Sequence, residues 1–178
     1  MVKLISKSAG AGLFPVSGPG LTVEEAAPAQ LTSMAAHGTA GWGALGTALK
    51  AAHGVALANP GELTAADGVR CAWFSASHVM LMGPAPDASL AAHAALTDQS
   101  DAWCHVILSG PRVAEMLAYL TPVDLREAAF PEGSAARSQI GHMNALILRS
   151  GSQRYELLVF RSMAGTLAHE IKEAIAAL

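Results

Sequence analysis

His169 and Glu170 stand next to each other near the C-terminus, as the first two residues of the His-Glu-x-x-His motif of zinc enzymes do. A second histidine should follow one helical turn later, but Lys172 and Glu173 occupy this region instead. The spacing therefore lacks the second metal ligand. Since His169 and Glu173 are four residues apart on a predicted helix, we interpret them as a pair on its solvent-exposed side.

The other metal-binding and nucleophilic side chains are scattered. The seven histidines stand singly, without ligand spacing, at positions 37, 53, 78, 93, 105, 142 and 169. His105 alternates with Trp103 and Ile107 along a predicted strand, which favours a hydrogen-bonded core histidine over a catalytic base. Cys71 and Cys104 lie in predicted strands without a Cys-x-x-Cys motif, so we interpret them as buried free thiols in a reducing cytoplasm.

No set of residues combines a nucleophile, a base and an oxyanion site. Ser109-Gly110-Pro111 precedes a predicted helix and could bind an anion, but it lacks phosphate-loop spacing and is interpreted as a strand-to-helix turn. Ser162 has no histidine at nucleophile spacing, and Asp98 and Asp101 are typical of capping or solvated loop residues. We therefore assign no catalytic, cofactor-binding or metal-binding residue to this chain.

Arg161 is the most informative single residue. It ends an apolar strand and is followed by small residues, which leave its guanidinium room to extend. Arginine is favoured at interfaces and at carboxylate sites, so Arg161 could anchor a partner subunit or a ligand. It could equally pair within the chain, with Asp124 or Glu156. The sequence leaves both alternatives open.

Composition narrows the class of protein. The length of 178 residues fits one domain, and the charged fraction of 14% is below the usual quarter. A surface with so little charge is tolerable where partner subunits cover it, although a genome that favours Ala and Gly explains it equally well. The net charge of −3 argues against nucleic-acid binding. Without a signal-like segment or a long apolar run, we expect a cytoplasmic protein that does not enter a membrane.

The patterning predicts an α+β fold. Residues 1–20 are expected to form a flexible tail, and residues 21–178 a single pseudo-duplicated domain with halves at about 21–96 and 97–178. Because hairpins dominate, the sheets should be mostly antiparallel, with helices packed on one side. The first half should contain paired strands at 21–27 and 30–37, a helix at 42–54, a loop at 59–68, a hairpin of 69–74 with 79–82, and a short helix within 86–97. The second half should contain strands at 103–109, 136–142, 144–150 and 155–160, a helix at 110–120, a structured loop at 121–133, and a last helix with Leu167, Ile171, Ile175 and Leu178 on one face.

Several motifs occur together between residues 21 and 178. They are LTVEEAAPAQL (21–31), SGP (109–111), PVDL (122–125), AFPEG (129–133), Ala136-Arg137, NALILR (144–149) and LVFRSMAGTLAHE (158–170). This combination resembles the gamma subunit of heterotetrameric sarcosine oxidase. The hairpin WFSASHV (73–79) departs from the Trp-Leu-Gly-Pro turn of that family, so the partner contacts of this hairpin do not carry over.

The resemblance implies a fold like the folate-binding domain of aminomethyltransferases. It also implies an assembly that demethylates sarcosine to glycine, with NAD and tetrahydrofolate in an alpha subunit, FAD and FMN in a beta subunit, and zinc in a delta subunit. In that family the gamma subunit binds none of these cofactors, so a structural subunit is expected here. The alternatives are the corresponding subunit of an N-methylglutamate dehydrogenase, or a stand-alone folate-binding protein of the aminomethyltransferase type. The latter would need catalytic and pterin-binding acids, and Asp124 in PVDL is more typical of a turn residue.

Overall fold

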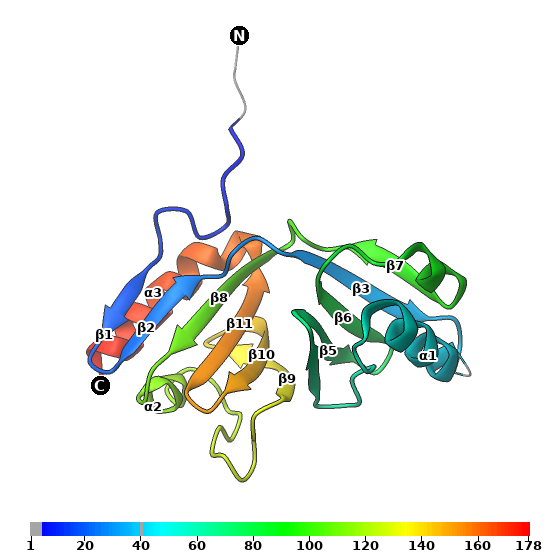
Figure 1. The fold of residues 1–178 in the computed structure, drawn as a ribbon. Coiled ribbons are helices and arrows are strands. Elements are labelled where there is room, and N and C mark those ends of the chain that lie inside the picture. The colour runs from blue at the N-terminus through cyan, green and yellow to red at the C-terminus, as the bar shows by residue number, and fades with distance from the viewer. Residues whose placement is uncertain (1–4, 40) are drawn as a thin grey trace.

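The computed structural model describes residues 5–39 and 41–178 and contains two antiparallel sheets (Figure 1). The six-stranded sheet has the order β1 (Val16–Gly18), β2 (Leu21–Glu25), β8 (Trp103–Ser109), β11 (Arg154–Phe160), β10 (Met143–Gly151) and β9 (Ser134–Ile140). The five-stranded sheet has the order β4 (Leu63–Ala66), β5 (Val69–Ser75), β6 (His78–Gly83), β3 (Gln30–Ala36) and β7 (Ala94–Asp98). The helices are α1 (Gly41–His53), α2 (Val113–Leu117) and α3 (Ala164–Ala176), with short 3-10 helices η1 (Ala88–Ala92) and η2 (Arg161–Met163). The predicted α+β class with antiparallel sheets is confirmed.

The elements pack in the layer order helix, sheet, sheet, helix. One face of the six-stranded sheet buries Val106 and Leu108 against α2 and α3, which contribute Leu117 and Leu167. Its other face meets the five-stranded sheet through residues such as Leu146, Leu148 and Leu158 on one side and Leu31, Met80 and Met82 on the other. The outer face of the five-stranded sheet packs on α1, whose Leu45 and Leu49 are fully buried. Each sheet thus has helices on one side, as expected, and the sheet–sheet layer lies at the centre of the molecule.

Two segments of the chain cross between the sheets. Residues 26–29 connect β2 to β3, and residues 99–102 connect β7 to β8. The prediction that strands 21–27 and 30–37 pair with each other is therefore wrong: Thr22 pairs with Ser109, whereas Leu31 pairs with Met82. Pro28 gives the physical reason, because a proline favours an extended residue before it and the chain continues forward instead of reversing.

Three further expectations differ from the structure. The predicted loop 59–68 contains β4, and the predicted helix within 86–97 is instead η1 followed by β7. Asp87 does cap η1, since its carboxylate accepts a hydrogen bond from the amide of Ser89 at 2.9 Å, but burial then alternates along β7 as in a strand. Helix α2 is shorter than the predicted 110–120. The helix α1, the hairpins β5–β6 and β9–β10, strand β11 and the helix α3 are confirmed.

The N-terminal residues also differ from the expected tail. Val16–Gly18 form β1, in which Val16 pairs with Val23 of β2. Leu13 and Phe14 pack against the core between the six-stranded sheet and its helices. A strand of three residues is too short to show a periodic pattern, which explains why it was not predicted. The proposed internal duplication of the two halves stays a prediction.

Candidate functional site

A charged network lies between the two sheets. Glu156 of β11 is 1% exposed, and its carboxylate accepts hydrogen bonds from Nη1 of Arg70 at 2.6 Å and from Nε2 of His105 at 2.7 Å. Arg70 belongs to β5 and His105 to β8, so the network joins both sheets. Burial by itself raises the pKa of Glu156, but His105 and Arg70 outweigh it and lower the pKa to about 2. The interpretation of His105 as a hydrogen-bonded core residue is confirmed, and its partner is the carboxylate of Glu156.

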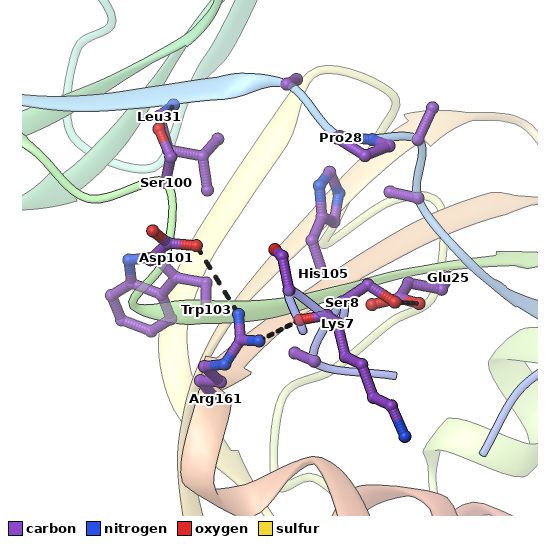
Figure 2. A pocket seen from close by; sticks show the side chains of 15 residues that line it. Lys7, Ser8, Glu25, Pro28, Leu31, Ser100, Asp101, Trp103, His105 and Arg161 are labelled. Carbon is purple, nitrogen blue, oxygen red and sulfur yellow. Dashed lines mark hydrogen bonds and ion pairs between the residues drawn. The ribbon is translucent and has the colours of Figure 1, made fainter. Parts of the chain in front are cut away.

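A cavity of about 260 Å³ opens beside this network (Figure 2). Its walls come from the two crossing segments, from residues 6–9 of the N-terminal segment, and from the side chains of Trp103, His105 and Arg161. Backbone hydrogen bonds hold both crossing segments beside it, from the amide of Ala26 to the carbonyl of His105 and from the amide of Arg161 to the carbonyl of Ala102. Binding pockets for small molecules usually have about 300–1,000 Å³, so this cavity is smaller than a typical cofactor site.

Arg161 reaches across the mouth of the cavity. Its Nη1 lies 3.7 Å from a carboxylate oxygen of Asp101, and its Nη2 donates a hydrogen bond to the carbonyl of Lys7. The backbone amide of Arg161 also donates to the carbonyl of Ala102 at 2.8 Å. The alternative pairing with Asp124 or Glu156 is therefore wrong, because both acids have other partners. Arg161 instead ties the N-terminal segment and the β7–β8 connection to the end of β11 (Figure 2).

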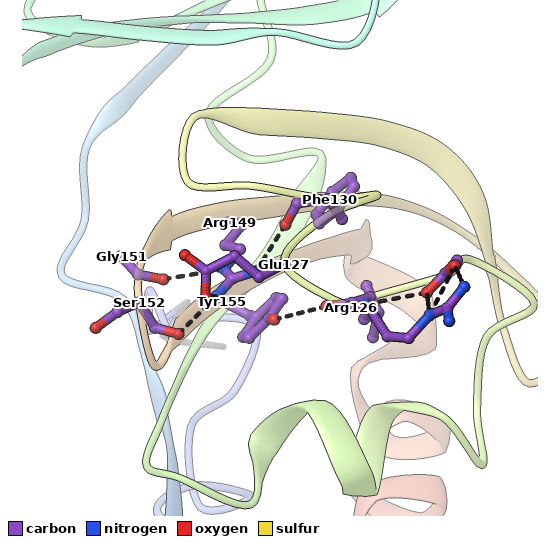
Figure 3. Close-up of polar contacts among 9 residues, drawn as sticks. Arg126, Glu127, Phe130, Arg149, Gly151, Ser152 and Tyr155 are labelled. Carbon is purple, nitrogen blue, oxygen red and sulfur yellow. Dashed lines mark hydrogen bonds and ion pairs between the residues drawn. The ribbon is translucent and has the colours of Figure 1, made fainter.

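A second arginine organises the loop that carries two of the sequence motifs (Figure 3). Arg149 of β10 is 4% exposed, and it donates hydrogen bonds to the carbonyls of Phe130 at 2.8 Å and Ser152 at 2.9 Å. Its guanidinium carbon also lies 5.4 Å from the ring centre of Tyr155. Arg149 was not singled out from the sequence, although its place at the end of the apolar run NALIL is the signal that indicates a buried arginine.

Asp124, the acid of the PVDL motif, has a turn role, as interpreted. Its carboxylate accepts a hydrogen bond from the amide of Arg126 at 3.1 Å and three more from Nε and Nη2 of the same arginine, which Figure 3 labels. The hydrogen bonds from Arg126 lower the pKa of Asp124 to about 2, so this acid is ionised at neutral pH. Asp124 is thus engaged by its neighbour in the turn.

A cluster of aromatic rings stands at one end of the sheet–sheet layer. Trp103 stacks on Phe160 with ring centres 4.9 Å apart and contacts Phe74 edge-to-face at 5.6 Å. The guanidinium carbon of Arg137 lies 4.3 Å from the ring centre of Phe74 and 5.7 Å from that of Trp103. The sequence did not predict this cluster, because its members come from four strands, β5, β8, β9 and β11. Arg137 and Phe160 stood in recognised motifs, but in two different ones.

The remaining candidate residues stay apart. Cys71 and Cys104 are buried free thiols, as predicted, and burial raises the pKa of each to about 11. Ser109-Gly110-Pro111 forms the predicted turn between β8 and α2, and Ser162 is exposed. Asp98 accepts from the amide of Ser100 at 2.9 Å, as a capping residue does. Within residues 5–39 and 41–178, no three His, Cys, Asp or Glu side chains group as metal ligands, and no ion pair joins the exposed His169 to Glu173.

These observations define a mixed α+β chain whose charged side chains fix two sheets, a loop and an N-terminal segment to one another. None of the helices that the structure describes is long and apolar enough to cross a bilayer. A family model of the sarcosine oxidase, gamma subunit family matches residues 37–177. The chain belongs to this family, which confirms the resemblance found in its motifs.

One solved structure agrees with this chain on the fold. A chain of the heterotetrameric sarcosine oxidase from Corynebacterium sp. U-96, in complex with pyrrole 2-carboxylate, is similar with a TM-score of 0.80 and 21% identity, over 97% of this chain and 95% of that chain. E. coli aspartokinase III, in complex with aspartate and ADP, has a TM-score of 0.44 at 12% identity, over 90% of this chain and 34% of that chain. The regulatory subunit of aspartate kinase from Thermus thermophilus has a TM-score of 0.38 at 13% identity, over 88% of this chain and 97% of that chain. The two kinase scores are too low to carry an argument. No curated protein matches.

Proposed function

We propose that this chain is the structural gamma subunit of a sarcosine-oxidase-type complex, which demethylates sarcosine to glycine. Membership of the sarcosine oxidase, gamma subunit family is the observation that carries the proposal. In this reading the chain binds no redox cofactor. Its partners, the alpha, beta and delta subunits, hold NAD, tetrahydrofolate, FAD, FMN and zinc, and the chain keeps their relative positions fixed.

The contacts of the motif residues support a structural role. Asp124 of PVDL is paired with Arg126, and Arg149 of NALILR donates to the loop that contains AFPEG. Arg161 of the last motif contacts Asp101 and Lys7. A side chain that already has intramolecular partners is a poor candidate for binding a substrate, because the ligand would have to replace these contacts. We also infer a relation to the folate-binding domain of aminomethyltransferases, which the two-sheet α+β fold favours.

Co-expression with the neighbouring reading frames tests the proposal. We expect this chain to elute from a size-exclusion column together with flavin absorbance, in equimolar ratio to the larger subunits, and the complex to oxidise sarcosine. A chain that elutes alone while its neighbours assemble without it contradicts the structural role. Comparison of sarcosine with N-methylglutamate as the substrate of the complex distinguishes the oxidase from the dehydrogenase alternative.

The isolated chain provides the second test. Titration with tetrahydrofolate should give no stoichiometric binding, and the purified chain should not turn over sarcosine. Clear folate binding by the lone chain would favour the stand-alone folate-binding protein instead. The two tests are independent, because a folate-binding protein of this fold has no reason to co-elute with flavin-containing subunits.

A further inference from the structure

The inner face of the six-stranded sheet extends beyond the cover of the five-stranded sheet. Side chains two residues apart on a strand share a face, so Phe160 lies on the same face as the buried Leu158. Gln139 likewise shares the face of Arg137, and Asn144 pairs with Gln139 across β9 and β10. Gln139 and Asn144 are exposed, and Phe160 is 47% exposed although it stacks on the buried Trp103. We call Arg137, Gln139, Asn144 and Phe160 the open end of the sheet–sheet layer.

The open end contains a cation that the fold does not neutralise. Arg137 is half-buried against the faces of Phe74 and Trp103, and its Nη1 is fully buried without a hydrogen-bond partner. Among the residues that the structure describes, Arg137 forms no ion pair with an acid. Burial lowers the pKa of this guanidinium, which reflects the cost of keeping a charge away from water. The other buried arginine, Arg149, has carbonyl partners, so Arg137 is the incomplete one of the two.

We propose that the open end is a docking surface for an acidic side chain of a partner subunit, with the carboxylate against Arg137 and a neighbouring apolar residue against Phe160. Charge complementarity selects this occupant, because an arginine held against aromatic rings binds a carboxylate strongly when both are removed from water. An exposed aromatic ring beside an arginine, with polar residues around them, is also the composition of a typical interface centre and rim. This inference rests on the proposed function, since it needs a complex in which to dock.

The test measures the affinity of this chain for its co-expressed partner subunits. Arg137→Met keeps an apolar side chain over Phe74 but removes the charge, and we expect binding to weaken by roughly ten-fold or more. Phe160→Ser should weaken binding by a similar factor. The matched controls are Arg154→Met, which removes an exposed arginine at the far end of β11, and Tyr119→Ser, which removes a ring that is 61% exposed after α2. Both controls should bind within about two-fold of the unchanged chain.

The salt dependence of binding supplies a readout that a packing defect would not change. High salt should weaken binding of the unchanged chain more than binding of Arg137→Met, because the charge contact is absent from the variant. In hydroxyl-radical footprinting, Phe160, which is 47% exposed, should be oxidised in the free chain and protected in the complex, whereas Tyr119, which is 61% exposed, should be oxidised in both. This labelling uses the unchanged protein, so it remains decisive even where a variant fails to fold.

The outcomes separate the inference from the proposed function. If the unchanged chain does not join the partner subunits, the proposed function fails and the docking surface fails with it. If the unchanged chain joins them but folded Arg137→Met binds equally well, or Phe160 is oxidised equally in the free chain and in the complex, only the docking surface is overturned. Melting curves of each isolated variant establish that it is folded before binding is compared.

Discussion

Glu156 on β11 and Arg70 on β5 form an ion pair of 2.6 Å that joins the two sheets across a sequence separation of 86 residues. His105 binds the second carboxylate oxygen, so the buried anion receives donors from both sheets. The rest of the sheet–sheet layer is largely apolar, and apolar contacts alone tolerate sliding better than a directed hydrogen bond does. The pair therefore fixes how the two sheets meet, which positions the crossing segments and the cavity beside them.

Removal of this anion should destabilise the chain. Glu156→Gln keeps the side-chain volume but leaves Arg70 without its counter-ion inside the layer, and we expect the free energy of unfolding to fall by about 3 kcal/mol. Urea denaturation followed by circular dichroism measures this change. The control is Glu173→Gln on the exposed side of α3, which should change stability by less than about 0.5 kcal/mol. Equal stability of the two variants would mean that the inter-sheet pair contributes nothing net.

The same carboxylate predicts a pH dependence. The pKa of Glu156 is lowered from 4.5 to about 2 in the folded chain, so the folded state favours the ionised form. Its stabilising contribution is complete above pH 4.5 and is lost as the pH falls toward 2. The contribution amounts to about 3 kcal/mol at most, by the usual conversion of a pKa difference into free energy. Unfolding free energies of the unchanged chain and Glu156→Gln should therefore converge in this range, and a gap that is independent of pH would contradict the assignment.

Sequence patterns predicted which segments form helices and strands better than they predicted which strands pair with each other. The helical spacing of Leu45 and Leu49 and the continuous apolar run of β10 were sufficient, because a single element determines each pattern. Strand β2 was also predicted, but its partner was not, since pairing depends on where the chain goes after Pro28. Short strands such as β1 and β4 contain too few residues to show a period.

The charged contacts were harder to predict for a related reason. Glu156 was considered only as a partner of Arg161, yet it binds Arg70, which stands 86 residues away on the other sheet. Arg161 itself lies 3.7 Å from Asp101, a fully exposed loop acid that the sequence does not indicate as its partner. Such partners are set by how two sheets pack face to face, and no local spacing records that packing. The family motifs did succeed, because they identify a fold as a whole without deriving any one contact.

The ordered structure of the loop at residues 121–133 should depend on Arg149. Arg149→Lys keeps the charge, but a single ammonium cannot reach the carbonyls of both Phe130 and Ser152 as the forked guanidinium does. We expect a loss of about 2 kcal/mol in unfolding free energy, because buried acceptors are left without donors. Limited proteolysis should also cut the loop faster. Arg126→Lys serves as the control, since Arg126 is 85% exposed and its pair with Asp124 contributes little. Unchanged proteolysis in Arg149→Lys would contradict the role.

Substitution of alanine for two different glycines should change the free energy of unfolding in opposite directions. Gly110 has a φ of +132°, and a Cβ there would overlap the carbonyl oxygen of Gly20 and lie 2.8 Å from the Cα of Leu21. Gly110→Ala should therefore lower the unfolding free energy by about 2 kcal/mol or more, because the turn after β8 and the β1–β2 turn would have to separate. Gly43 lies in α1 with open space around its Cα, so Gly43→Ala should raise the unfolding free energy by about 0.5 kcal/mol through higher helix propensity. Thermal and urea denaturation of both variants give the sign directly, and a stable Gly110→Ala protein would show that the two turns are not tightly packed.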